Sequence, residues 1–139
     1  MAKNTFTRRQ SREQALCYLY EYSMQPDLPP SAIISSARTE RDADPSPYAT
    51  LLFKTALEHL DDIDAGIRAS SRNWDFERIS KVSLAILRMT AAEVLFLPEH
   101  PAAEIAVNEA LELARMYGTE DSVPFINGIL GTMLRPQDQ

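Results

Sequence analysis

The sequence predicts an all-α protein, a single-domain helical bundle of about six or seven helices. Apolar residues recur at the spacing of helical turns, and no alternating pattern typical of strands persists. Glycine is scarce, with four residues, and prolines divide the chain into segments of helical length. The chain has 139 residues and is 45% hydrophobic, which suffices for one core. We therefore treat residues 1–139 as one domain.

The first helix is expected to begin near Thr7, because Thr7 and Gln10 form the pattern of a capping box. Prolines from Pro26 onward end this helix. The residues expected on its inner face are Ala15, Leu16, Leu19 and Tyr20. Ser31 is placed to cap a second, short helix.

A third helix is expected to begin at Pro47, since proline suits the first helical position, where a backbone N–H would lack a partner. One face of this helix carries the apolar residues Leu52, Ala56, Leu60, Ile63 and Ile67. Acidic residues lie largely on the other faces. We therefore predict one continuous helix through residue 67.

The segment from Asp75 to Leu97 carries apolar residues on two helical faces. A helix that is apolar on two faces is normally buried on both, so this segment is predicted to be the central helix. It is expected to break near Ser80 into a short lead-in and a long rod. Arg88 is a charged residue within this apolar helix. We expect it to form a buried ion pair, with Glu93 or Glu109 as its partner.

Two further helices complete the expected bundle. Pro101 opens the first of them, and Gly118 is expected to end it in the left-handed conformation that favours glycine. Residues 119–122 then supply caps for a last helix, with Pro124 in its first turn. One face of that helix carries Phe125, Ile129 and Met133.

The charge of the chain is unevenly distributed. The net charge is −6, which argues against a protein that coats nucleic acid over its whole surface. Four basic residues nevertheless precede the first acid, Glu13; they are Lys3, Arg8, Arg9 and Arg12. Residues 1–7 are expected to form a flexible basic arm. Such an arm either binds a phosphate chain or is a solvated terminus, and composition alone leaves both interpretations open.

No pattern for catalysis, metal binding or a cofactor is recognised in the sequence. The two histidines and the lone Cys17 have no metal-ligand spacing, and no glycine-rich phosphate loop is present. Asp61, Asp62 and Asp64 lack the spacing of a calcium loop and are expected to form a solvated helix face. Cys17 is expected to be a small buried apolar residue. With no signal peptide or membrane span recognised, we expect a cytoplasmic protein that is not an enzyme.

Three stretches together resemble the NusB family of bacterial transcription antitermination factors. The first is RRQSREQALCYLY at residues 8–20, and the second is ILRM at residues 86–89, followed by Ala92 and Glu93. The third comprises VNEALELAR at residues 107–115, YGTEDS at 117–122 and FINGIL at 125–130. Their order and spacing match the family from one end of the chain to the other.

The resemblance implies an RNA-binding adaptor. NusB-like proteins pair with a small ribosomal subunit protein, NusE, and the pair binds the boxA element of nascent RNA. With other Nus factors they help RNA polymerase to read through terminators, notably in ribosomal RNA operons. By position, the residues that match the family's RNA-binding surface are Arg8, Arg9, Arg12, Tyr117, Asp121, Ser122 and Phe125, to which we add Lys3 of the basic arm. Tyr20 and Ser83 match positions that face the protein partner.

These residue types suit single-stranded RNA. Arginine binds phosphate oxygens, and the rings of Tyr117 and Phe125 can stack on bases. The first turn of the last helix is expected to offer N–H groups. Asp121 either accepts hydrogen bonds from base amino groups or caps that helix. We expect the arm and residues 117–125 to form one continuous surface, and Tyr20 to be partly exposed.

The chain departs from the family pattern at a few positions. Ser83 stands where several members carry an acid, and Val123 and Pro124 replace a more polar pair. These changes affect the expected strength of the partner and RNA contacts. The alternatives are a helical protein-interaction module without RNA activity, and the NusB-like domain that precedes a methyltransferase in some RNA-modifying enzymes. Since family members include monomers and dimers, a homodimer is also possible.

Overall fold

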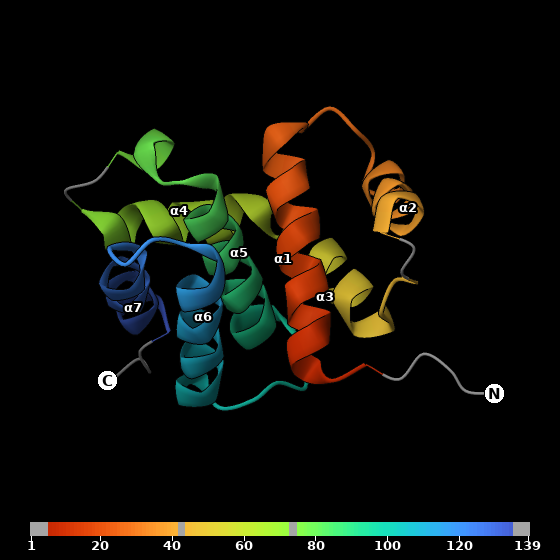
Figure 1. The fold of residues 1–139 in the computed structure, drawn as a ribbon. Coiled ribbons are helices and arrows are strands. Elements are labelled where there is room, and N and C mark those ends of the chain that lie inside the picture. Colours follow the sequence, from red (N-terminus) through yellow and green to blue (C-terminus); the bar gives the residue numbers. More distant parts are fainter. Residues whose placement is uncertain (1–5, 42–43, 73–74, 135–139) are drawn as a thin grey trace.

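The computed structural model describes residues 6–41, 44–72 and 75–134. In these ranges the chain forms seven α-helices and one short 3-10 helix, without strands (Figure 1). The elements are α1 (Arg8–Met24), α2 (Pro30–Arg41), α3 (Pro47–Glu58), α4 (Leu60–Ser71), η1 (Phe76–Arg78), α5 (Lys81–Phe96), α6 (Ala103–Tyr117) and α7 (Ser122–Met133). The prediction of an all-helical bundle with six or seven helices is confirmed.

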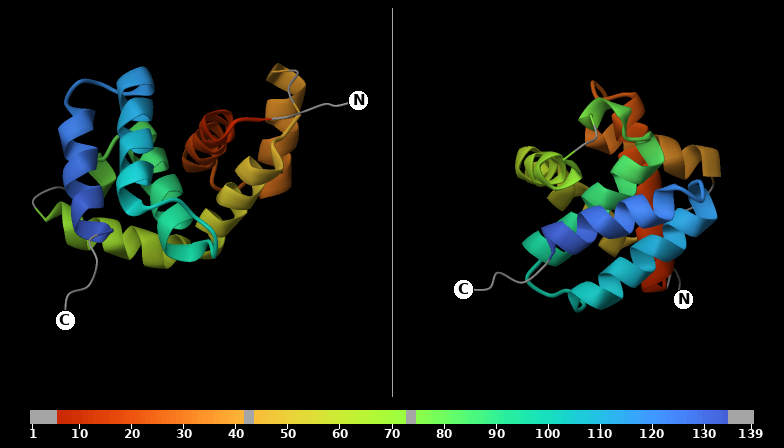
Figure 2. Two further views of the ribbon diagram at one scale, coloured as in Figure 1. Left: turned by 90° about the horizontal axis from the view of Figure 1, so that it is seen from below. Right: turned by 90° about the vertical axis from the view of Figure 1, so that its left-hand side faces the viewer.

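Helix α5 is the centre of the bundle. It packs against α1, α3, α4, α6 and α7, which surround it in the views of Figures 1 and 2. Helices α1 and α6 run side by side in the same direction, and both rest on α5 (Figure 1). Helix α2 packs on α1 at one edge, and α7 packs on α4, α5 and α6 at the other.

The burial of α5 follows from its sequence. Eleven consecutive residues, Ser83–Glu93, are buried, as expected for a helix that is apolar on two faces. Ile86, Leu87 and Met89 are fully buried, and each such side chain contributes about 1.5–3 kcal/mol by leaving water. The expected break is also confirmed, because η1 precedes the helix and the Ser80 side chain caps it.

Helix α1 begins with the predicted capping box. The Gln10 N–H donates to the Thr7 hydroxyl oxygen at 2.9 Å, and the Thr7 N–H donates to the Gln10 side chain at 2.9 Å. Of the two expectations for Tyr20, partial exposure is confirmed and the inner-face position is wrong, since Tyr20 is 38% exposed and Tyr18 is buried instead. Helix α1 packs on α2, α3 and α5, so the side that carries Tyr18 is covered and the ring contacts Phe53 of α3.

The predicted third helix is two helices. Helix α3 ends at Glu58 and α4 begins at Leu60, with His59 between them at φ −115° and ψ 23°. The His59 ring stacks on Phe96 of α5, with ring centroids 4.0 Å apart. The apolar periodicity continues across the break, so the sequence pattern does not reveal it. The break depends on packing against α5 instead.

The other helix starts partly agree with the prediction. Helix α3 begins at Pro47, and Ser46 caps it by accepting from the Ala49 N–H at 3.2 Å. Helix α2 begins at Pro30, so Ser31 lies inside its first turn and is not the cap. None of the helices in the described ranges is long and apolar enough to span a membrane.

Gly118 ends α6 for a reason that differs from the prediction. Its φ of −105° is not left-handed, so conformational freedom at positive φ is not what requires glycine. A Cβ atom at this position would lie 2.5 Å from the Ser122 hydroxyl oxygen and 3.0 Å from the Ala114 carbonyl oxygen. Glycine is needed because the start of α7 approaches the end of α6 closely.

Alanine substitutions at two glycines test this explanation, because we expect opposite changes in the free energy of unfolding. Gly118→Ala should lower the free energy of unfolding by about 1–3 kcal/mol, because the added methyl group overpacks a tight turn. Gly131→Ala should raise it by about 0.5–1 kcal/mol, since Gly131 is exposed in α7 and a Cβ there meets nothing within 4 Å. Urea unfolding of both variants checks the pair, and equal stability changes would contradict the explanation.

Candidate nucleic-acid interface

The predicted RNA-binding arginines lie in the first two turns of α1, but their side chains differ in exposure. Arg8 and Arg9 are exposed, whereas Arg12 is 6% exposed and belongs to the buried interior. Lys3 lies outside the described residues. The structure therefore divides the three predicted arginines of α1 into two that are exposed and one that is buried.

Arg12 forms a buried ion pair with Glu93 of α5. Its Nε donates to Glu93 Oε1 at 3.0 Å, and its Nη2 donates to Oε2 at 2.8 Å. The Tyr48 hydroxyl of α3 donates to the same carboxylate. Burial by itself lowers the pKa of Arg12, but the hydrogen bonds and charge of Glu93 outweigh burial and raise it. Burial and the hydrogen bond to Glu93 likewise raise the pKa of Tyr48 far above its ordinary value.

Arg12 is therefore not part of the exposed surface of the protein. Its guanidinium faces α5 and already has two carboxylate hydrogen bonds, so an RNA phosphate would have to displace a buried counter-ion to reach it. Its place in the structure is that of a group that joins α1 to α5 and α3.

Arg9 forms a second ion pair, which is open to solvent. Its Nε and Nη2 donate to the two carboxylate oxygens of Glu109 in α6, at 3.1 and 3.2 Å. The hydrogen bond and charge of Arg9 lower the pKa of Glu109. The Arg9 side chain remains 45% exposed, so this pair is screened by water and contributes little to stability. Arg12 lies 4.0 Å from the same carboxylate.

Arg8 has an aromatic contact. Its guanidinium lies over the Tyr48 ring, 3.7 Å from the ring centroid. This cation–π contact holds the exposed Arg8 beside Arg9 and leaves its charge accessible. Arg8 and Arg9 are thus the described members of the arm that can meet a phosphate from solvent.

Arg88 forms the expected buried ion pair with an unexpected partner. Its Nε and Nη2 donate to the Asp64 carboxylate of α4 at 2.9 and 2.8 Å. The two predicted partners pair with arginines of α1 instead: Glu93 binds Arg12, and Glu109 binds Arg9. This distribution follows from the positions of α1 and α4 on α5, which the sequence pattern does not show.

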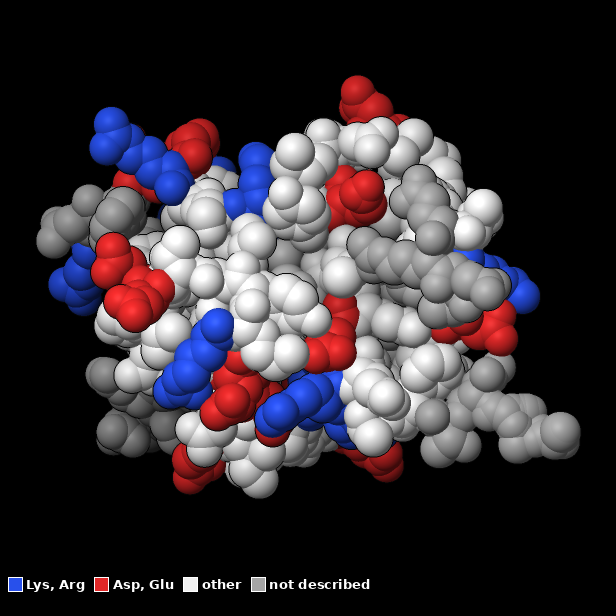
Figure 3. Space-filling view, in the orientation of Figure 1, with Lys and Arg blue, Asp and Glu red and all other residues white. Residues whose placement is uncertain are grey.

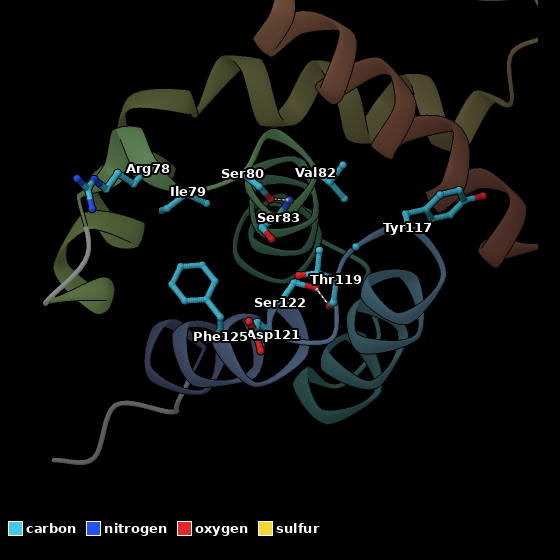
Figure 4. A pocket seen from close by; sticks show the side chains of 11 residues that line it. Arg78, Ile79, Ser80, Val82, Ser83, Tyr117, Thr119, Asp121, Ser122 and Phe125 are labelled. Atoms are coloured by element: carbon cyan, nitrogen blue, oxygen red, sulfur yellow. Dashed lines mark hydrogen bonds between the residues drawn. The ribbon is translucent and has the colours of Figure 1, made fainter.

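The second part of the predicted interface surrounds a pocket of about 360 Å³ between η1, the start of α5 and the start of α7 (Figure 4). Its apolar walls come from Ile79, Val82, Tyr117 and Phe125. Tyr117 is exposed at one end, and the Phe125 ring projects from α7 toward Ile79 (Figure 4). The Phe125 ring thus borders the pocket, whereas the Tyr117 ring points away from it toward α1 (Figure 4).

A smaller pocket of about 190 Å³ continues toward α1. It is lined by Leu16, Cys17, Tyr20, Val82 and Tyr117. Because Val82 and Tyr117 line both pockets, the two form one groove that crosses the start of α5. Tyr20 is partly exposed here, as predicted, while Cys17 is half-buried in the groove wall and not in the core.

Ser83, which the resemblance assigns to the partner-facing positions, is a buried residue. It is 3% exposed, and its side chain forms part of the floor of the larger pocket (Figure 4). A serine side chain is short and ends below the rim. A partner can therefore reach Ser83 by inserting a group into the pocket, not by passing over its surface.

The residues at the start of α7 correct two expectations. The Ser122 hydroxyl donates to the Thr119 carbonyl oxygen, and Ser122 is buried. The N–H groups of Ser122 and Val123 donate to carbonyl oxygens in the preceding turn, and Pro124 has no N–H, so this turn does not offer the expected set of donors. Asp121 makes no capping hydrogen bond with its side chain and is exposed at the pocket.

Arg9 and Tyr117 lie along the same seam between α1 and α6, whereas Phe125 lies on α7 at the larger pocket. Arg9 contacts Glu109 at one level of the seam, and Tyr117 shares a pocket with Leu16 and Tyr20 farther along. Eight residues separate Glu109 from Tyr117 along α6, a rise of about 12 Å. The charged side chains on this face are mixed in sign, with no continuous basic patch (Figure 3).

Sequence reasoning missed several residues of this region. Glu93 and Glu109 were considered as partners of Arg88 only, and Tyr48 carried no signal because its role depends on how α3 meets α1. Arg78 is the cation at the pocket rim, and its sequence neighbours give no sign of it. The described residues contain no cluster of three or more side chains suited to hold a metal ion.

The buried pair can be tested by removing its carboxylate. Glu93→Ala should lower the free energy of unfolding by about 3–5 kcal/mol, because the buried Arg12 then loses its hydrogen-bonded counter-charge and keeps only the carboxylate of Glu109 at 4.0 Å. Glu112→Ala is a matched control, since Glu112 forms an exposed pair with Arg115 at 3.0 Å and should cost less than about 1 kcal/mol. Urea unfolding measures both, and similar costs would show that the Arg12–Glu93 pair has no special structural role.

Known proteins resemble this chain over nearly its whole length. Residues 9–135 match the NusB family. The transcription antitermination protein NusB of Desulforamulus reducens is 39% identical over 134 residues, covering 95% of this chain and 92% of the relative.

Solved structures show the same fold. NusB of T. maritima superposes with a TM-score of 0.81 at 28% identity, covering 95% of this chain and 93% of that structure. A complex of the antitermination factors NusB and NusE with dsRNA contains a chain with a TM-score of 0.80 at 24% identity, covering 92% and 96% respectively. The chain therefore belongs to the NusB family.

Proposed function

We propose that this protein is a transcription antitermination factor that binds boxA RNA together with the ribosomal protein NusE and promotes processive transcription of ribosomal RNA operons. The NusB family is a non-enzymatic one, in agreement with the expectation that the chain is not an enzyme. The observation that carries the proposal is the seam between α1 and α6, where the exposed Arg9 and the exposed rings of Tyr20 and Tyr117 lie.

The two ion pairs of α1 have different roles in this proposal. The Arg9–Glu109 pair is open to water, so an RNA phosphate can replace Glu109 at small cost. The Arg12–Glu93 pair is buried and stays in place, since separating it would leave a charge in the interior. Arg8 and Arg9 then contact phosphates, while Arg12 keeps α1 in position beside α6.

The aromatic residues supply what the arginines lack. Phosphate contacts orient RNA without reading its sequence, whereas unstacked bases bind aromatic faces. Tyr117 and Phe125 offer such faces at the pocket, and the exposed Asp121 carboxylate can accept hydrogen bonds from base amino groups. Single-stranded RNA that follows the seam would meet the arginines first and the pocket next.

The protein partner is proposed to cover the smaller pocket beside Tyr20. The net charge of −6 and the few exposed arginines limit the attraction of this chain for RNA. We therefore expect weak RNA binding by the chain alone and tight binding with the partner. In this role the protein acts in the cytoplasm, in a complex with other Nus factors and RNA polymerase. A homodimer is an alternative state of the protein.

Two sets of substitutions test how RNA is held. Arg8→Ala with Arg9→Ala should weaken binding to all single-stranded RNAs and reduce the log–log salt slope by about 0.7 for each phosphate that no longer meets an arginine. Phe125→Ala should reduce the preference for boxA over scrambled RNA, because a stacked base is worth ~1–3 kcal/mol, and should leave the salt slope nearly unchanged. Phe125→Leu controls for the smaller apolar volume of alanine.

Titrations of labelled boxA, scrambled and duplex RNA at several salt concentrations, with and without NusE, measure these effects. Thermal unfolding of each variant checks that the fold persists. An arginine double variant with the original affinity and salt slope would exclude the arm from RNA binding. Equal affinity for boxA and scrambled RNA in the presence of NusE would instead favour the interaction module without RNA activity.

The partner surface has its own test. Tyr20→Asp should abolish NusE binding and leave the fold intact, because Tyr20 is 38% exposed and lines the smaller pocket. Met24→Asp is the matched control, since Met24 is exposed in the last turn of the same helix and lines neither pocket. Calorimetric titration with NusE and circular dichroism distinguish the outcomes. Unchanged binding by the Tyr20 variant would place the partner elsewhere.

A further inference from the structure

The arginine and lysine side chains of this protein differ in whether a carboxylate or an aromatic ring already contacts their charged group. Among the described residues, most arginines near α1 and α5 have a carboxylate or aromatic partner: Arg8, Arg9, Arg12, Arg68 and Arg88. Arg78 and Lys81 are exposed, and no ion pair in the described part of the chain involves either of them. These two cations lie at the corner between η1 and α5.

The position of Arg78 relates it to the larger pocket. Arg78 and Ile79 line the end of that pocket opposite Tyr117, and the Arg78 guanidinium points outward from this end, away from the pocket (Figure 4). The Phe125 ring lies between these two ends (Figure 4). The groove therefore has an exposed cation at the η1 corner, Arg78, while Arg9 lies beyond its other end, farther along the α1–α6 seam beside Glu109.

We propose that Arg78 is a second phosphate anchor, so that the RNA path continues past Phe125 and leaves the protein across the corner between η1 and α5. The proposal rests on the proposed RNA-binding function and extends it to a site outside the predicted interface. A base lies in the pocket against Phe125, and the phosphate that follows it meets the Arg78 guanidinium. Lys81, one turn farther along, adds positive charge beside it.

The chemistry of the pocket favours a nucleotide as the occupant. Its volume of about 360 Å³ accommodates a planar base, and its walls combine apolar side chains with the polar Asp121 and Ser83. Arginine presents a planar set of donors that fits phosphate oxygens. The neighbouring acids Asp75 and Glu77 are exposed and reduce the positive potential of this corner, so the proposed contact is limited to a single phosphate.

The test compares Arg78→Ala with Lys54→Ala, which removes the same charge from an exposed position on α3 that lines neither pocket. In the presence of NusE, Arg78→Ala should reduce the salt slope for single-stranded boxA RNA by about 0.7 and weaken binding about fivefold at 0.1 M salt, as expected when one phosphate no longer has its cation. Arg78→Lys should restore most of the slope, and Lys54→Ala should behave like the unsubstituted protein.

A series of RNAs extended by single nucleotides at the 5′ or the 3′ end locates the anchor. Extension at one end should strengthen binding by the unsubstituted protein and not by Arg78→Ala.

NusE binding without RNA should be the same for both, and a weaker affinity for NusE in Arg78→Ala would assign the corner to the protein partner and overturn the inference. An unchanged slope in Arg78→Ala, with the Arg8/Arg9 double variant still impaired, would refute the anchor while leaving the proposed function standing. Failure of the unsubstituted protein to bind boxA RNA would refute both.

Discussion

The buried ion pair between Arg12 and Glu93 is the constraint on which the interface depends. It joins α1 to the central helix α5, and Tyr48 of α3 completes it from a third helix. A charge in the interior requires a counter-charge at hydrogen-bond distance, so the pair tolerates little displacement of one helix against another. This restraint sets the position of the first turns of α1, and with it the position of the exposed Arg8 and Arg9.

Neighbouring arginines on one helix thereby have different roles. Arg12 points toward α5 and has a structural role, whereas Arg9 points across the seam to Glu109 and remains accessible to solvent. The difference lies in the surroundings of the two side chains, because Arg9 and Arg12 carry the same charge. A solvent-exposed pair exchanges its partner at small cost, and a buried pair does not. Fewer arginines of α1 are therefore available to bind phosphate than the sequence alone indicates.

The central position of α5 explains why distant segments meet. Helices α1 and α6 rest side by side on it, and its N-terminal end forms the floor of the groove through Val82 and Ser83. The tight turn at Gly118 then brings α7 back against the same end, which places Phe125 opposite η1. The groove is a consequence of helix packing around one buried rod, and residues from both ends of the chain line it.

Local features of the chain could be predicted from the sequence, because they depend on neighbours within a few residues. The capping box at Thr7, the start at Pro47 and the break at Ser80 are examples, and the two apolar faces of residues 81–96 predicted a buried centre. The break at His59, the partner of Arg88 and the burial of Arg12 and Ser83 could not be predicted in this way. Each depends on which helix lies opposite, and that is decided by long-range packing and charge pairing, which helical periodicity does not encode.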